Sequence, residues 1–128
     1  MSKHRVLLID DEEEFTELLS MNLLRTGKFE IGIVNDATKA VDYARTFKPD
    51  IILLDIVMPG IDGGDVASAL RSDPDLGSVP VILVSALVSN SEIDDDEIAK
   101  AGDRIVLAKP VKMEKLLRIV DQLLGSGA

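Results

Sequence analysis

Short runs of aliphatic residues recur along this 128-residue chain, and most of them end in a polar residue. Four runs are uniformly apolar, which is typical of strands buried on both faces of a parallel sheet. They cover residues 6–9, 51–54, 81–84 and 105–108. A fifth run, residues 29–33, alternates Phe and Ile with Glu30 and Gly32 and therefore predicts a half-exposed edge strand.

Between these runs the apolar residues take helical spacing. A first helix is expected from about Glu12 to Arg25 and ends at Gly27, and a last one from about Lys112 to Leu124 ends at Gly125. The predicted apolar face of the first helix consists of Phe15, Leu18, Leu19 and Leu23. That of the last helix consists of Met113, Leu116, Leu117, Val120, Leu123 and Leu124.

Three shorter helices are expected in the middle of the chain. Asp36 is placed to cap the second helix, and Pro49 ends it. The apolar stripes are Ala37, Ala40, Val41 and Ala44 for the second helix and Val66, Ala69 and Leu70 for the third. The fourth helix, from Asn90 to Lys100, has the weakest pattern, because residues 94–97 form a like-charged acidic run.

Strands that alternate with helices predict an α/β fold, (βα)₅, in which a parallel sheet carries helices on both faces through right-handed crossovers. The length predicts a single domain over residues 1–128, with a core from about residue 5 to 124. The sequence shows no internal repeat and no interdomain linker.

Composition excludes several classes of function. The formal net charge of −9 argues against direct binding to nucleic acid or to an anionic membrane, since both need a basic surface. The chain has no Cys and a single His, His4, which excludes disulfides, Cys-based zinc sites and multi-His metal sites. The first apolar run is too short for a signal peptide, so we expect a soluble cytoplasmic protein.

Polar residues that follow the buried strands are the candidate chemistry. They are Asp10 and Asp11 after the first strand, Asp55 after the third, Ser85 after the fourth and Lys109 after the fifth. Taken one at a time, each residue has an ordinary structural interpretation. Asp10 or Asp11 could be a helix cap, Asp55 a turn residue, Ser85 a loop hydroxyl and Lys109 a surface lysine. Taken together they share one edge of a parallel sheet, the edge at which open α/β sheets bind ligands.

Crowded carboxylates at that edge need a counter-charge. Mg²⁺, coordinated by two carboxylates, a backbone carbonyl and water, is the natural one, and Lys109 adds a fixed positive charge. This set favours phosphoryl transfer to a carboxylate, with Asp55 as the nucleophile and Ser85 donating to a phosphoryl oxygen. No His is available as an internal donor, so the phosphoryl group must come from another protein or a small molecule.

At these residues the chain resembles the receiver domain of response regulators in two-component signalling systems. The motifs are Leu8-Ile9-Asp10-Asp11-Glu12, Asp55-Ile56-Val57-Met58-Pro59-Gly60-Ile61-Asp62-Gly63, Val84-Ser85-Ala86 and Ala108-Lys109-Pro110. The resemblance covers residues from about 5 to 124. It implies a doubly wound, flavodoxin-like (CheY-like) sheet with the strand order 2-1-3-4-5.

The resemblance also assigns roles by position. Asp55 is the expected phosphoacceptor; Asp11, Asp55 and the backbone carbonyl of Val57 are expected to ligate Mg²⁺ directly, and Asp10 through water. Ser85 is the expected switch hydroxyl and Lys109 the expected partner of the phosphoryl group. The implied partners are a histidine kinase or phosphotransfer protein and a downstream effector. The module would catalyse only its own phosphorylation and dephosphorylation.

Four positions depart from the family pattern. Val106 replaces an aromatic residue that turns inward on activation, and Val111 replaces a common Phe, so we expect a different route of signal output. Val57 and Leu87 stand where polar residues often orient an attacking water. We therefore expect a long-lived phosphorylated state.

Two rival functions follow from the same fold class. One is a receiver-like interaction module that works without phosphorylation, as the missing aromatic residue suggests. The other is a flavin-binding module, but its phosphate loop would be rich in Ser, Thr and Gly rather than Asp10, Asp11 and Glu12. A P-loop nucleotide site is excluded because the Gly-x-x-x-x-Gly-Lys-Ser/Thr motif is absent.

Overall fold

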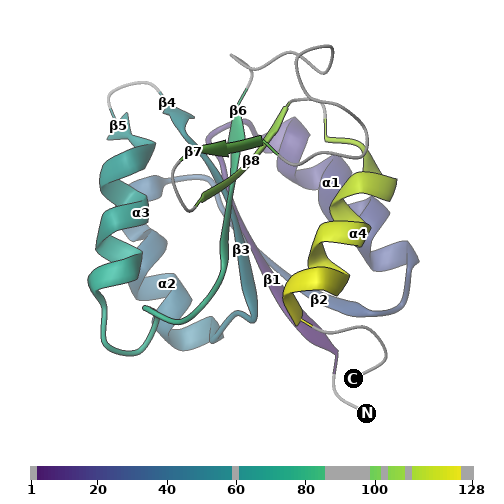
Figure 1. Cartoon of the computed structure of the whole chain (residues 1–128), viewed down its shortest axis with the longest axis horizontal. Coiled ribbons are helices and arrows are strands. Elements are labelled where there is room, and N and C mark those ends of the chain that lie inside the picture. The colour runs from purple at the N-terminus through teal and green to yellow at the C-terminus, as the bar shows by residue number, and fades with distance from the viewer. Residues whose placement is uncertain (1–2, 59–60, 86–98, 102–103, 109–110, 125–128) are drawn as a thin grey trace.

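The protein is an α/β sandwich built on one six-stranded sheet with the strand order β2-β1-β3-β6-β8-β7 (Figure 1). This computed structural model describes residues 3–58, 61–85, 99–101, 104–108 and 111–124. The first five strands in that order are parallel, and they confirm the α/β class and the strand order 2-1-3-4-5. Their bounds are β1 His4–Ile9, β2 Phe29–Val34, β3 Ile51–Asp55, β6 Val81–Ser85 and β8 Arg104–Ala108.

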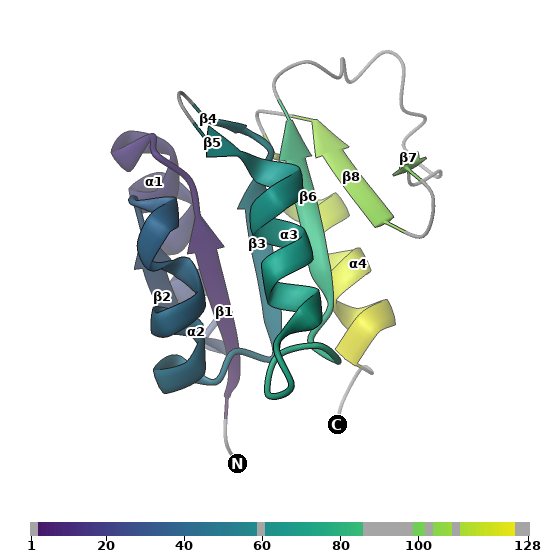
Figure 2. The same cartoon turned by 90° about the vertical axis from the view of Figure 1, so that its left-hand side faces the viewer.

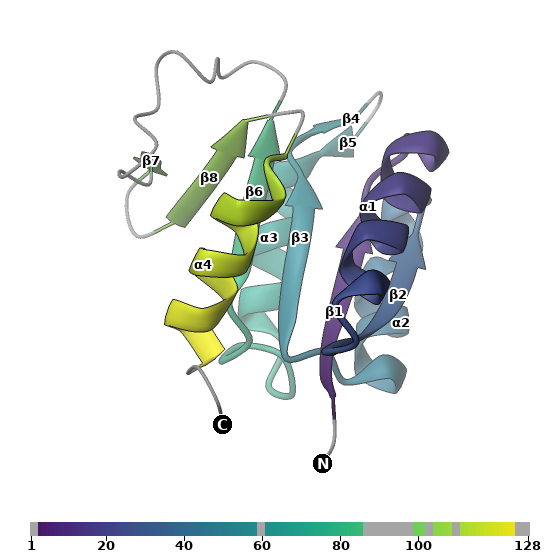
Figure 3. The same ribbon diagram turned by 90° about the vertical axis from the view of Figure 1, so that its right-hand side faces the viewer.

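Helices cover both faces of the sheet, as a doubly wound fold requires. Figure 2 shows α2 and α3 in front of one face, and Figure 3 shows α1 and α4 in front of the other. The described helices are α1 Glu13–Arg25, α2 Ala40–Phe47, α3 Gly63–Ser72 and α4 Met113–Leu124, with a short 3₁₀ helix η1 Ala37–Lys39 before α2.

The two layers of the core follow from the alternation of side chains along each strand. Leu7 and Ile9 pack on the α2 and α3 side, whereas Val6 and Leu8 pack on the α1 and α4 side. These four residues are at most 1% exposed. Each fully buried Leu or Ile side chain contributes about 1.5–3 kcal/mol through removal of apolar surface from water. The uniformly apolar runs are therefore explained by burial on both faces.

Three of the helices bury a face that differs from the expected one at one or more positions. Leu18 is 61% exposed on α1, while Thr16 and Ser20 are buried with Leu19 and Leu23. Successive residues point about 100° apart on a helix, so the i, i+3, i+4, i+7 face that includes Leu19 leaves Leu18 outside. The predicted inward position of Leu18 is wrong.

The same kind of error affects α3 and α4. On α3 the buried alanine is Ala67, and Ala69 is exposed. On α4 Ile119 is fully buried together with the predicted Leu116, whereas Leu123 is 36% exposed. Apolar residues on neighbouring faces have nearly equal weight in a sequence pattern, and only the packing partner decides between them.

The expected fourth helix is corrected at its end. Ala99–Ala101 form a strand, β7, which pairs antiparallel with β8 through Ala99 and Val106. Without it, β8 would present an unpaired row of backbone groups at the sheet edge. A helix reaching Lys100 is therefore wrong, and the rest of that segment lies outside the described residues. Between β3 and α3, β4 Val57–Met58 and β5 Ile61–Asp62 form a small antiparallel hairpin.

Candidate functional site

The register of the sheet decides which strand ends meet. Ile9 pairs with Leu54, so Asp10 and Asp55 come next on neighbouring parallel strands. Asp55 pairs with Val84, and Ser85 is the last residue of β6. All three residues therefore lie at the carboxyl edge of the sheet. This is the edge toward which the strand arrows point in Figures 2 and 3. The sequence predicted this convergence correctly.

Three carboxylates gather at this edge. One carboxylate oxygen from each of Asp10, Asp11 and Asp55 lies within 4.8 Å of the other two. Asp10 and Asp55 are 2% and 3% exposed, whereas Asp11 is exposed to solvent. Hard oxygen donors at this spacing suit a divalent cation such as Mg²⁺ or Ca²⁺. The donor set therefore fits a metal ion that is open to water on the side of Asp11.

Asp10 is held in a turn that leads into α1. Its Oδ1 accepts a hydrogen bond from the Glu12 N–H at 2.9 Å, and its own N–H donates to the Val34 carbonyl at 3.1 Å. Glu12 is the N-cap residue of α1, and its side chain makes no capping hydrogen bond. Neither Asp10 nor Asp11 is thus the N-cap of α1, and the reading of these residues as simple helix caps loses its support.

Ser85 and Asp55 are both buried, at 1% and 3% exposure. Ser85 pairs with Ala108 at the end of β8, and Lys109 comes directly after Ala108. Lys109 and Leu87 lie outside the residues that the structure describes. The backbone of Val57 belongs to β4, two residues beyond Asp55.

The two positions expected to alter signal output lie in different layers. Val106 is buried at 7% exposure and belongs to the core layer of α2 and α3. Val111 is partly buried against the layer of α1 and α4. Val106 is thus an ordinary core residue here, with no ring that could move between buried and exposed positions.

Asn35, which was not among the predicted site residues, lies beside the acidic site. Its Nδ2 donates to the backbone carbonyl of Asp10 at 2.8 Å and to Thr16 Oγ1 at 3.1 Å. A sequence signal existed, because Asn35 follows the last residue of β2 just as Asp10 follows β1. An asparagine directly before a helix cap is, however, ordinary in sequence terms.

Asp36, the next residue, was predicted as a cap and is one. Its Oδ1 accepts hydrogen bonds from the Thr38 N–H at 3.0 Å and from Thr38 Oγ1 at 2.6 Å, at the start of η1. The Thr38 hydroxyl and, second, the Thr38 backbone N–H hold the pKa of this carboxyl below its usual value. The β2–α2 junction next to Asn35 is therefore well anchored.

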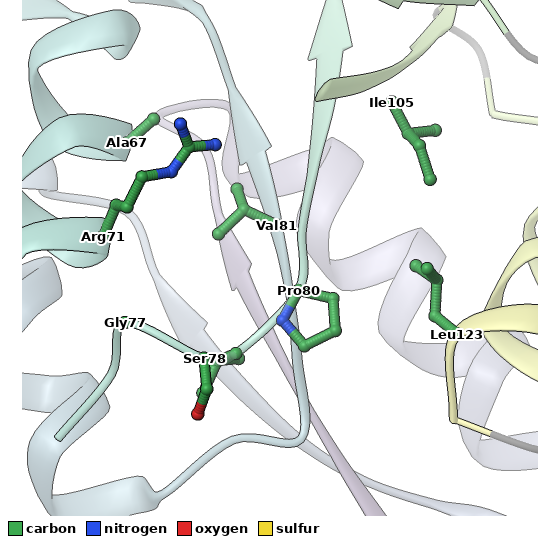
Figure 4. Close-up of a pocket in the computed structure, with 9 residues that line it drawn as sticks. Ala67, Arg71, Gly77, Ser78, Pro80, Val81, Ile105 and Leu123 are labelled. Atoms are coloured by element: carbon green, nitrogen blue, oxygen red, sulfur yellow. The ribbon is translucent and has the colours of Figure 1, made fainter. Parts of the chain in front are cut away.

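One cavity, drawn in Figure 4, is lined by none of these carboxylates. It has a volume of about 260 Å³ and lies at the opposite, amino-terminal end of β6. Its lining comprises Ala67, Arg71, Gly77, Ser78, Val79, Pro80, Val81, Ile105 and Leu123. This lining contains no carboxylate, and an ion held by strand-end oxygens needs no deep cavity. The cavity is therefore separate from the acidic site.

The fold and the acidic strand ends define a class, the doubly wound α/β domains that work at the carboxyl edge of a parallel sheet. The comparison with protein families is more specific. The family model of the response regulator receiver domain matches residues 6–121. The chain belongs to this family, which confirms the resemblance seen in the motifs, and it is a signalling module of that class.

Two curated relatives show the range of this family. The DNA-binding response regulator MtrA of Mycobacterium tuberculosis is 31% identical over 115 residues, which cover 90% of this chain and 48% of MtrA. This chain thus spans about half the length of that relative. The polar-differentiation response regulator DivK of Brucella anthropi is 28% identical over 119 residues, which cover 93% of this chain and 95% of DivK.

Solved structures agree on the fold. A response regulator from Desulfuromonas acetoxidans is 26% identical with a TM-score of 0.71, covering 94% of this chain and 96% of the other. The chemotaxis protein CheY4 of Vibrio cholerae has a TM-score of 0.78 at 24% identity, covering 95% and 99%, and shows the shared fold alone.

Within the part of the chain that the structure describes, none of the helices combines the length and apolar character needed to cross a bilayer.

Proposed function

We propose that this chain is a phosphoacceptor receiver in which Asp55 accepts a phosphoryl group in a Mg²⁺-dependent reaction. The observation that carries the proposal is the grouping of Asp55 with Asp10 and Asp11, one oxygen of each within 4.8 Å of the others, at the carboxyl edge of the sheet. Three carboxylates at that spacing favour a divalent cation, and a cation next to a strand-end carboxylate favours phosphoryl chemistry.

In the proposed step a carboxylate oxygen of Asp55 attacks the phosphorus atom of the donor. The bond from phosphorus to the donor's imidazole nitrogen or acetyl oxygen breaks, and the leaving group departs with that electron pair. The product is an acyl phosphate on Asp55. Bound Mg²⁺ would neutralise charge on the transferred phosphoryl oxygens.

The chain's own residues have distinct tasks in this scheme. Asp11, Asp55 and the Val57 carbonyl would bind the metal, and Asp10 would act through water. Ser85 is already at the end of β6 and donates to one phosphoryl oxygen. Lys109, one residue beyond Ala108 in the sequence, would pair with a second phosphoryl oxygen.

The domain organisation, the cellular location and the partners are part of the same proposal. Residues 1–128 act as a single receiver domain in the cytoplasm. The phosphoryl donor is a histidine kinase, a phosphotransfer protein or a small acyl phosphate, and the output is altered binding of an effector protein. The net charge of −9 argues against direct contact with nucleic acid or with a membrane.

Intact mass after incubation with acetyl phosphate tests the proposal. We expect one added phosphoryl group when Mg²⁺ is present and none when it is chelated. Asp55→Asn should remove the labelling, because an amide is a poor nucleophile and cannot form the acyl phosphate. Asp36→Asn is the matched control, since Asn caps a helix about as well as Asp and Asp36 is already engaged with Thr38.

Equal labelling of wild type and Asp55→Asn would show that the phosphoryl group goes elsewhere. No labelling of the wild type in any condition would instead favour the rival function, an interaction module that does not need phosphorylation.

The lifetime of the phosphorylated state is a second part of the proposal. Val57 and Leu87 are apolar, so neither side chain can orient a water for attack on phosphorus. Val57→Asn combined with Leu87→Glu should shorten the half-life of the phosphorylated protein by about a hundredfold, the lower end of the range for a positioned acid–base group. An unchanged half-life in a chase experiment would contradict this explanation.

A further inference from the structure

The ladder between β1 and β2 ends at the acidic site. Its last backbone bond runs from the Asp10 N–H to the Val34 carbonyl, at 3.1 Å. Beyond Val34 the chain turns into η1, which begins at Ala37. The carbonyl of Asp10 then receives the Nδ2–H of Asn35, at 2.8 Å. A side-chain amide thus continues the ladder at the point where the backbone of β2 leaves it.

The same amide nitrogen reaches α1. Its second hydrogen-bond partner is Thr16 Oγ1, at 3.1 Å. The Thr16 hydroxyl in turn donates to the Glu13 carbonyl, at 3.0 Å. Thr16 is 1% exposed and Asn35 is half-buried. One amide therefore joins the end of β1, the end of β2 and the first turn of α1.

We propose that Asn35 is a positioning residue for the metal site, acting through the backbone of Asp10. The segment that it clamps, residues 10–12, carries two of the three clustered carboxylates. Asn35 itself supplies no atom to the cluster. Its role is to keep the main chain of Asp10 in place while three like charges repel one another.

Hydrogen bonds hold this segment from two directions. From the strand side, the Asp10 N–H bonds to Val34 and the Asp10 carbonyl to Asn35. From the loop side, Asp10 Oδ1 accepts the Glu12 N–H. Removing the amide removes its bond to the Asp10 carbonyl and so releases one of these anchors. The preorganisation of Asp10 and Asp11 for a cation is then lost, as when a supporting hydrogen bond behind a metal ligand is removed.

This inference rests on the proposed function, because it assumes that the acidic cluster binds Mg²⁺. Calorimetric titration with Mg²⁺ alone, on the full chain, separates the two claims. We expect Asn35→Ala to raise the Kd for Mg²⁺ about tenfold, the lower end of the range for supporting residues, because water can replace part of the lost bond at this half-buried position.

Thr16 offers a second variant. Thr16→Val keeps the shape of the side chain but removes the acceptor that orients the amide, and should raise the Kd by a smaller factor than Asn35→Ala does. Since the two residues act through one bond network, the double variant should bind Mg²⁺ no more weakly than Asn35→Ala alone. Independent, additive effects would contradict the clamp.

Thr38→Ala is the matched control. It removes a hydrogen bond to Asp36 in the same segment but leaves Asp10 untouched, so its Kd should stay within about twofold of wild type. Thermal unfolding without metal is measured in parallel, since a merely structural role would lower Tm and leave the Kd unchanged.

The outcomes are distinguishable. A wild type that shows no saturable Mg²⁺ binding, or that binds as well after Asp11→Asn, overturns the proposed function and with it this inference. A wild type that binds Mg²⁺ while Asn35→Ala binds equally well overturns this inference alone.

Discussion

Two buried aspartates of this protein have opposite surroundings. Asp55, 3% exposed, lies at the carboxyl edge of the sheet in a cluster with two other carboxylates. Asp73, 6% exposed, directly follows α3 at the other end of the sheet. Its positively charged partner is another side chain of this protein. Among the residues that the structure describes, the same residue type at nearly the same burial thus lies beside other carboxylates in one place and beside a guanidinium in the other.

Arg45 of α2 is the cation beside Asp73. Its Nε and Nη2 lie 2.7 and 2.5 Å from Asp73 Oδ2, and the Asp75 N–H donates to Oδ1 at 2.8 Å. The Asp75 backbone N–H and then the Arg45 guanidinium hold the pKa of Asp73 below its ordinary value of 3.8, against the opposing effect of burial. This carboxylate ties α2 to the turn after α3.

The contrast separates a structural carboxylate from a binding one. Burying a charge is costly unless the fold neutralises it, and Asp73 meets that condition within the chain. The cluster around Asp55 instead gathers three acidic groups, an arrangement that gains from a cation taken from solution. Substitutions at the two aspartates should therefore respond differently to Mg²⁺, acid and salt.

Mg²⁺ should stabilise the protein through the cluster alone. At a Mg²⁺ concentration roughly 100 times the Kd, linkage adds about 2.7 kcal/mol to the free energy of unfolding. Asp11→Asn and Asp55→Asn should each remove most of this gain, because both lose an anionic ligand. Asp73→Asn should keep it in full. Urea unfolding with Mg²⁺ and with a chelator measures the difference; a Mg²⁺ effect lost only in Asp73→Asn would reverse the assignment.

Asp73→Ala should destabilise the fold more than any substitution in the acidic cluster. It leaves the Arg45 guanidinium without its buried partner and removes the acceptor for the Asp75 N–H. Unfolding in metal-free buffer measures the loss. Asp42→Ala is the control, because Asp42 also lies near Arg45, at 3.5 Å, but is largely exposed and should cost little. Equal losses for the two variants would argue against a special role for Asp73.

The sequence was sufficient for the sheet and for the acidic edge, for a physical reason. Runs such as residues 51–54 must be buried on both faces, and parallel strands then force Asp10, Asp55 and Ser85 to one edge. Neither conclusion depends on how individual side chains pack.

The orientation of the helices could not be predicted in the same way. Leu18 and Leu19 are chemically alike, and only the packing of α1 against the sheet selects Leu19 for the core. Asn35 was missed because its role depends on two hydrogen bonds between segments far apart in the sequence. The strand β7 was missed because edge pairing is a property of the assembled sheet.

Acid should unfold the protein partly through Asp73. Because its pKa in the folded state is depressed, the stabilisation that it provides is fully present above its ordinary value of 3.8 and is lost as pH falls through the lower folded value. The difference in unfolding free energy between wild type and Asp73→Asn should therefore be constant near neutrality and shrink below about pH 4. A difference that grows on acidification would contradict this sign.

One substitution in the acidic cluster should stabilise the metal-free protein slightly. In metal-free buffer, Asp55→Asn removes one of three neighbouring charges and should raise the free energy of unfolding, by on the order of 1 kcal/mol. Asp73→Asn in the same buffer should lower it, since there the carboxylate faces a cation. Added salt should reduce the gain in Asp55→Asn, because screening weakens the repulsion that the substitution relieves. If Asp55→Asn instead destabilised the metal-free protein, Asp55 would be a structural carboxylate like Asp73, and the acidic edge would have to be neutralised from within the fold.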